Sequence, residues 1–400
     1  MHQIQRRWKV ASHVLLVALL VLIAVPRPAT GQEYTGKRKF IYALIGALAV
    51  GVPAYIAANE SDFSNFCSNR TCMGFLGASL GGAVGFLIGS EVDASYERRM
   101  AAGPSLSYTY ESVPLDLVPD RLTWFPGGAA VAGVGGARIV FNDGSTLSRA
   151  SGVRGIEDVA VLPGLDLLVL STFSNLIAFP VLGDTASGAV IDERGGGAME
   201  NVNDRLAVAS LDSLRLLRVL AREEGLSVEE LAGIEHREFV TDMIYAPFSG
   251  VAWLLLEDLL VSYSPDFERL GEFRLPVIGR SVRADGSRLA VAAGSSGVYV
   301  LDARDPKQPR VVLHYTGVRF AYTADLAGDR LYVAAGPEGV VLIDVSGAEP
   351  VVLGVAREMR FASDVVAADD GAIWILDREG RSVQIADFAT EATGEPSARR

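Results

Sequence analysis

The stretch Asp158-Val-Ala-Val-Leu-Pro-Gly-Leu-Asp-Leu-Leu-Val169 decides the fold, because the chain repeats its pattern. A polar anchor is followed by an apolar strand, and a tight turn then leads to a second apolar strand. The same order returns at Asp242-Met-Ile-Tyr-Ala-Pro-Phe-Ser-Gly-Val-Ala-Trp253 and at Asp364-Val-Val-Ala-Ala-Asp-Asp-Gly-Ala-Ile-Trp-Ile375. A repeat of about 40 residues that is built from short strands is the sequence signature of a β-propeller.

Seven such units follow one another, with anchors spaced 38 to 45 residues apart. The anchors are Asp120, Asp158, Gly197, Asp242, Arg280, Tyr322 and Asp364. The second strand of each unit is almost wholly apolar, as expected for a strand that is packed on both faces between neighbouring sheets. We therefore predict an all-β, seven-bladed β-propeller over residues 104–390, with a disordered polar tail at 391–400.

Ring closure requires one more strand, because the seventh unit shows only three. Residues 106–112 alternate apolar and polar side chains, which is typical of an outer strand. We predict that this segment completes the last blade from the other end of the propeller. The pairing would cover two sheet edges that otherwise invite aggregation.

Units five and six carry a family resemblance. Arg288-Leu-Ala-Val-Ala-Ala-Gly-Ser-Ser-Gly-Val-Tyr-Val-Leu-Asp302 and Arg330-Leu-Tyr-Val-Ala-Ala-Gly-Pro-Glu-Gly-Val-Val-Leu-Ile-Asp344 resemble LVIVD-type propeller repeats. The resemblance covers about residues 280–355 and is degenerate elsewhere. Members of that family are mostly exported or cell-surface proteins of unassigned activity, so the resemblance implies a fold and a compartment.

The N-terminus resembles an export signal. Residues 1–31 hold a basic start, an aliphatic run from Val14 to Val25, and small residues at Ala29-Thr30-Gly31. This order predicts a secretory signal peptide. The alternative is an uncleaved membrane anchor.

Residues 40–95 contain two apolar stretches of about 18 residues each, just long enough to cross a bilayer as helices. The second stretch has a glycine at every fourth position, namely Gly77, Gly81, Gly85 and Gly89. Such a stripe lets two helices approach closely in a membrane. The segment resembles the glycine-zipper hairpins of bacterial envelope proteins, which implies membrane association through residues 40–90 and a homo-oligomer formed through the zipper. The alternative is a buried hairpin in a soluble domain.

Cys67 and Cys72 lie in the loop between the two apolar stretches. A short-loop disulfide is expected if that loop reaches an oxidising compartment, and two free thiols are the alternative. Three crossings of the inner membrane would leave this loop in the cytoplasm. A hairpin that enters an outer membrane from the periplasm would not, and the sequence leaves both arrangements open.

The anchors are the candidate site. Innermost strands line the central channel of a propeller, so Asp120, Asp158, Asp242, Arg280, Tyr322 and Asp364 should converge near one mouth. Converged carboxylates could bind calcium or a cationic ligand. The structural alternative is that each aspartate accepts backbone N–H groups at the start of its own strand.

Composition and motifs narrow the function. The net charge of −12 argues against a nucleic-acid partner. The chain lacks a nucleophile elbow, a zinc-protease motif and a haem-attachment motif, so no catalytic residue or cofactor is predicted. We expect an exported, membrane-associated scaffold of the cell envelope that binds a protein or polysaccharide. The alternative is an envelope enzyme, a carboxylate-based hydrolase or lyase with its site at the channel mouth.

Overall fold

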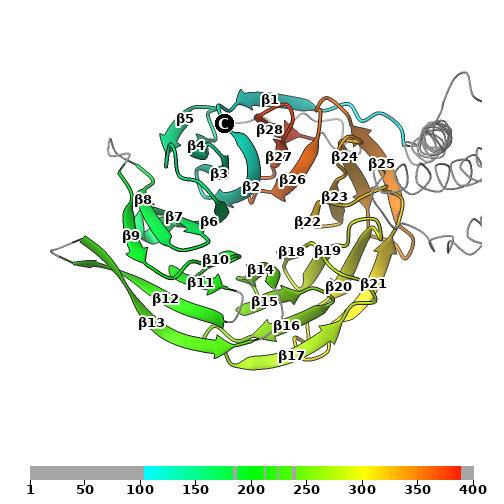
Figure 1. Cartoon of the computed structure of the whole chain (residues 1–400). Coiled ribbons are helices and arrows are strands. Elements are labelled where there is room, and N and C mark those ends of the chain that lie inside the picture. The colour runs from blue at the N-terminus through cyan, green and yellow to red at the C-terminus, as the bar shows by residue number, and fades with distance from the viewer. Residues whose placement is uncertain (1–102, 183–186, 211–212, 223–224, 237–239, 389–400) are drawn as a thin grey trace, which may run out of the picture. The chain divides into compact units, whose positions relative to one another are not determined.

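A computed structural model describes residues 103–388, apart from 183–186, 211–212, 223–224 and 237–239. The strands form seven antiparallel sheets of four strands each, arranged in a ring (Figure 1). The seven-bladed β-propeller expected from the repeat is therefore confirmed. In blades 1 to 6 the first strand is innermost and the chain then moves outward one strand at a time, whereas in blade 7 the outermost strand comes from the start of the propeller.

The first four blades have the following strands, in order from the centre outward. Blade 1 contains β2 (Val118–Phe125), β3 (Gly128–Val134), β4 (Gly136–Phe141) and β5 (Thr146–Arg149). Blade 2 contains β6 (Ile156–Leu162), β7 (Leu167–Thr172), β8 (Leu176–Pro180) and β9 (Ala189–Asp192), with a 3-10 turn η1 (Pro163–Leu165) after β6. Blade 3 contains β10 (Met199–Val202), β11 (Arg205–Ala209), β12 (Ser213–Arg222) and β13 (Gly225–Glu235). Blade 4 contains β14 (Val240–Ala246), β15 (Val251–Leu256), β16 (Leu259–Tyr263) and β17 (Arg269–Arg274).

The other three blades continue the ring. Blade 5 contains β18 (Ser281–Asp285), β19 (Arg288–Ala292), β20 (Val298–Asp302) and β21 (Arg310–Tyr315). Blade 6 contains β22 (Thr323–Ala327), β23 (Arg330–Ala334), β24 (Val340–Asp344) and β25 (Val351–Ala356). Blade 7 contains β26 (Ala362–Ala367), β27 (Ile373–Asp377), β28 (Ser382–Asp387) and, as its outer strand, β1 (Thr109–Pro114).

The two ends of the propeller meet in blade 7, as predicted. Strand β1 runs antiparallel to β28, from the pair Thr109↔Asp387 to the pair Pro114↔Ser382. The residues just before β1 also hold blade 6, because Leu106 N–H donates to the carbonyl of Val355 at 3.0 Å. One short segment thus bonds two neighbouring blades.

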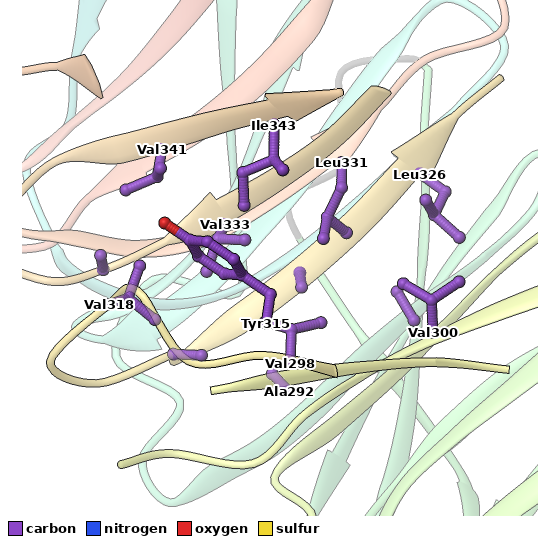
Figure 2. Close-up of a cluster of buried hydrophobic side chains, with 14 of the residues drawn as sticks. Ala292, Val298, Val300, Tyr315, Val318, Leu326, Leu331, Val333, Val341 and Ile343 are labelled. Carbon is purple, nitrogen blue, oxygen red and sulfur yellow. The ribbon is translucent and has the colours of Figure 1, made fainter. Parts of the chain in front are cut away.

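A separate apolar core lies between each pair of neighbouring blades, seven in all. The second strand of each blade is continuously apolar because each of its two faces packs against a different one of these cores. Along β19, Leu289 and Val291 face the core shared with blade 4, whereas Ala290 and Ala292 face the core shared with blade 6. Figure 2 shows the latter core, where the ring of Tyr315 packs among valine and leucine side chains of both blades.

The ring follows from this packing because no blade can bury both of its faces alone. The cluster shared by blades 7 and 1 joins Trp374 to Val131, so the circle is closed by packing as well as by β1. The large side chains Trp253 and Trp374 are 1% and 0% exposed, which places them among the best-buried groups of the ring.

Several predictions concern residues that the structure does not describe. The signal peptide at 1–31, the glycine-zipper hairpin at 40–95, the Cys67–Cys72 pair and the tail at 391–400 all lie outside the described residues. Within the described part of the chain, no helix is long and apolar enough to cross a bilayer.

Candidate functional site

The candidate site is a cavity of about 690 Å³ on the propeller axis. Residues from the first strand of every blade contribute to its wall, together with loops at one end of the channel. We call that end the mouth face. It carries the loops that enter each first strand and the turns between the second and third strands, because consecutive strands run antiparallel.

Two levels of side chains surround the axis. The first ring is defined by the residue of each first strand that occupies the same register against the second strand: Arg121, Asp158, Ala198, Asp242, Ser281, Thr323 and Asp364. The second ring lies two residues further along each strand: Thr123, Ala160, Glu200, Ile244, Arg283, Asp325 and Val366. All of these residues except Ala160 line the cavity.

The charges alternate between the two levels. Blades 2, 4 and 7 carry an aspartate in the first ring and an apolar residue in the second. Blades 3, 5 and 6 carry a small residue in the first ring and a charged one in the second. Each of these six blades thus supplies a single charge from its two ring positions.

Most of the aspartates join blades. Asp158 accepts the N–H of Val159 at 2.9 Å and that of Met199, in blade 3, at 2.8 Å. Asp242 likewise bonds its own strand through Met243 and blade 5 through Val282, at 3.0 and 2.9 Å. These side chains satisfy backbone donors that would otherwise be left without a partner beside the channel.

Asp325 and Thr323 make the same kind of contact between blades 6 and 7. Asp325 accepts the N–H of Leu326 at 2.8 Å and that of Ala367 at 2.9 Å. The hydroxyl of Thr323 accepts the N–H of Val365 at 3.0 Å. The aspartates therefore accept backbone N–H groups of their own strands, as the structural alternative expected. Three of them also accept an N–H from the next blade.

Two arginines balance part of the negative charge. Arg283 reaches across the channel from blade 5, with its guanidinium 3.0 Å from Asp242 and 3.7 Å from Asp364. Arg121 lies 4.0 Å from Asp158 and also donates to the carbonyl of Glu157. Burial opposes the positive charge of Arg283, but the surrounding carboxylates outweigh it and raise its pKa.

Glu200 stands apart from the other acids. No ion pair within 4.0 Å and no N–H from another blade is found for its carboxylate among the described residues, and Arg283 affects it only through longer-range attraction. Burial raises the pKa of Glu200 to about 8, and the nearby negative charges of Asp158 and Asp242 add to the effect. Burial likewise raises the pKa of Asp325 to about 7 and that of Asp158 to about 6.

An aromatic group borders the mouth. Tyr322 packs on Phe320 and Phe361, with ring centroids 4.6 and 5.0 Å apart. The guanidinium of Arg280 lies 5.1 Å from the centre of the Phe320 ring, a cation–π distance. Gly336 makes this packing possible, because a Cβ there would lie 2.7 Å from the Tyr322 ring.

The structure brings all six predicted contact residues to the cavity wall: Asp120, Asp158, Asp242, Arg280, Tyr322 and Asp364. Their levels differ. Asp120 is the extra residue of a β-bulge, so Arg121 holds the ring position in blade 1. Arg280 and Tyr322 each lie one residue before the first ring and belong to the mouth. Whether these residues contact a ligand remains a prediction.

Sequence reasoning missed Glu200, Arg283 and Asp325. Each lies three residues after the anchor assigned to its unit, namely Gly197, Arg280 and Tyr322. The three units that lack an anchor aspartate therefore share a charged residue at a constant offset, and this pattern could have identified these residues from the sequence. Among the residues described by the structure, no three histidine, cysteine or carboxylate side chains converge as a metal site requires, so this cavity lends calcium binding no geometric support.

Known structures share the fold. A chain of a structure titled "Crystal Structure of Mitotic Checkpoint Complex" matches with a TM-score of 0.60 and 9% identity, over 72% of this chain and 94% of that one. The WD40 β-propeller domain of Doa1 matches with a TM-score of 0.54 and 11% identity, over 71% of this chain and 98% of that one. No family model and no curated protein matches the sequence. At these identities the likeness establishes the fold alone.

Proposed function

We propose that this protein is an interaction scaffold of the cell envelope, whose propeller binds a protein or polysaccharide partner at the mouth face. The supporting observation is the exposed apolar side chain of Ile278 at the channel mouth, on a face that also exposes Phe173 and Val134. Phe173, Val134 and Ile278 are 80%, 75% and 62% exposed. Ile278 also lines the cavity, so a partner seated there would cover the channel. One of the matching structures is, by its title, a protein complex, and that agrees with a scaffold role.

Two phenylalanines on opposite faces provide a matched test. Phe173 lies in the turn between β7 and β8, on the mouth face, and Phe248 lies in the turn between β14 and β15, on the other face. They are 80% and 82% exposed, so either substitution removes a similar surface group. Partners crosslinked to the tagged full chain in native envelopes should be lost with Phe173→Ser and retained with Phe248→Ser. Equal retention in both variants would contradict binding at the mouth face.

The compartment and the anchor are part of the same proposal. We place the propeller outside the cytoplasm, held by the hairpin at 40–95, with Gly77, Gly81, Gly85 and Gly89 packing helix against helix. Protease added outside the inner membrane should then reach the propeller. Replacing Gly81 and Gly85 by leucine should abolish oligomers in native gels and leave β-sheet circular dichroism unchanged. A protected propeller would contradict the placement.

The cavity itself favours a second candidate, an envelope hydrolase or lyase. Glu200 has a pKa of about 8 and Asp158 one of about 6, so near neutral pH one carboxyl keeps its proton and the other has lost it. Such a pair suits general acid and base catalysis. Envelope polysaccharides assayed for cleavage should be degraded by the wild type and spared by Glu200→Gln. Absence of cleavage by the wild type would contradict the enzyme candidate and retain the scaffold proposal.

A further inference from the structure

We propose that the central channel binds a small organic cation, a primary amine or linear diamine, through Glu200 and Ser281. The first argument is one of charge. Five carboxylates from the two rings face two arginines, and both arginines already contact aspartates of the first ring. The acids therefore outnumber the arginines, and a cation bound in the channel would favour the charged form of the acids whose pKa burial raises.

The second argument concerns which acid is free to bind. Asp158, Asp242 and Asp325 each direct both oxygens toward backbone N–H groups, one of them in the next blade. These groups hold the ring together. Glu200 also lines the cavity, but the backbone N–H that stabilises its charged form is that of Asn201 in its own strand, and no bond to another blade is found among the described residues. A buried carboxylate that has one N–H of its own strand and no cation within ion-pair distance is costly to keep charged, and a bound cation would reduce that cost.

A third observation is independent of the acids. Ser281 is 3% exposed and lines the cavity, and its hydroxyl has no hydrogen-bond partner among the described residues. Buried hydroxyls are normally bonded, so this oxygen beside the cavity can accept a donor that the described residues do not supply.

The chemistry of an ammonium matches these two groups. It carries three N–H donors and no acceptor, whereas a carboxylate and a hydroxyl oxygen both accept. The cavity of about 690 Å³ is within the range of small-molecule pockets. A linear diamine could reach more than one carboxylate, with its apolar chain along the axis.

The experiment uses the full chain in detergent, with 1,5-diaminopentane and spermidine as probes and 1,5-pentanediol as the neutral analogue. Isothermal titration calorimetry should show saturable binding of the amines, no binding of the diol, and a rise in melting temperature with the amines only. Loss of one charged hydrogen bond weakens binding by about tenfold or more, so Glu200→Gln should raise the Kd by at least that factor. Ser281→Ala should raise the Kd less, because a neutral acceptor is lost.

The matched control is Glu349→Gln. Glu349 is exposed in the connection between β24 and β25, so this substitution removes one negative charge away from the channel. Its Kd for the diamine should equal that of the wild type. The proposal is overturned if the amines do not bind at millimolar concentration, if Glu200→Gln binds as well as Glu349→Gln, or if only a basic peptide binds. The scaffold proposal is unaffected by each of these outcomes, because it depends on Phe173.

Discussion

Replacing Asp325 by alanine should loosen the contact between blades 6 and 7. Asp325 is 6% exposed, and its two oxygens accept the N–H of Leu326 in its own strand and that of Ala367 in blade 7. Alanine leaves both donors without that partner. The bond to Ala367 joins the two blades, so its loss falls on their interface.

The magnitude follows from the two donors. Each buried N–H group that loses its partner costs about 1–3 kcal/mol. The variant also removes the cost of burying the Asp325 carboxyl, the same burial that raises its pKa to about 7. This gain offsets part of the loss. We expect a decrease of about 2–4 kcal/mol in the free energy of unfolding, or a fall of roughly 4–8 °C in melting temperature for a domain of this size.

The assay is thermal unfolding of the full chain in detergent, followed by far-UV circular dichroism. Asp143→Ala is the control, because Asp143 is exposed and accepts hydrogen bonds from the N–H and the hydroxyl of Ser145, both within its own turn. It should change the melting temperature by less than about 2 °C, since surface substitutions are usually within about 0.5 kcal/mol. Asp325→Asn keeps one carbonyl oxygen and should fall between the two. An equal effect of Asp325→Ala and Asp143→Ala would refute the role of Asp325 between blades.

Three further outcomes are expected. Deleting residues 104–113 should lower the melting temperature by several degrees, because β1 covers the edge of β28; an unchanged melt would contradict closure by this strand. Burial raises the pKa of Glu200 from its ordinary 4.5 to about 8. Between these values the folded state holds a proton that the unfolded chain has lost, so the free energy of unfolding should fall by about 1–3 kcal/mol from about pH 5 to about pH 8. Denaturant titrations of Glu200→Gln should show a flatter dependence on pH, and an equal slope would exclude Glu200 as its source. Gly336→Ala should destabilise by about 1–2 kcal/mol more than Gly286→Ala, because both glycines have a positive φ but only Gly336 has a ring within 3 Å of an added Cβ; equal unfolding midpoints would contradict this packing.

The period of the repeat was enough to predict the number of blades and the position of most strands. Ring closure was also predictable, because residues 106–112 alternate apolar and polar side chains although they precede the repeats. The strand itself, Thr109–Pro114, begins later, since Leu106 is bonded to blade 6 instead. Contacts between distant segments of this kind leave no mark in the local pattern.

The levels of the anchor residues were not predictable, and β-bulges are the reason. The first strands of blades 1, 2, 4 and 7 each contain a bulge, with one extra residue before the ring position. Those of blades 3, 5 and 6 have no such register shift. An alignment of the units by residue type falls one residue short at Ala198, Ser281 and Thr323, and in blade 1 it selects the bulge residue Asp120 in place of Arg121. A bulge is set by the pairing of two strands, which no single strand encodes.

The same distinction separates structural acids from candidate ligand-binding acids in this channel. An aspartate directly before an N–H donor of its own strand can bond that donor with one oxygen and the neighbouring blade with the other, as Asp158, Asp242 and Asp325 do. The longer side chain of Glu200 occupies the same level as Asp325 but bonds no other blade among the described residues. Ring assembly thus accounts for the aspartates and leaves Glu200 unexplained. A ligand that neutralises Glu200 would account for its place on the axis, and for this reason the variants of that residue are the most informative ones to make.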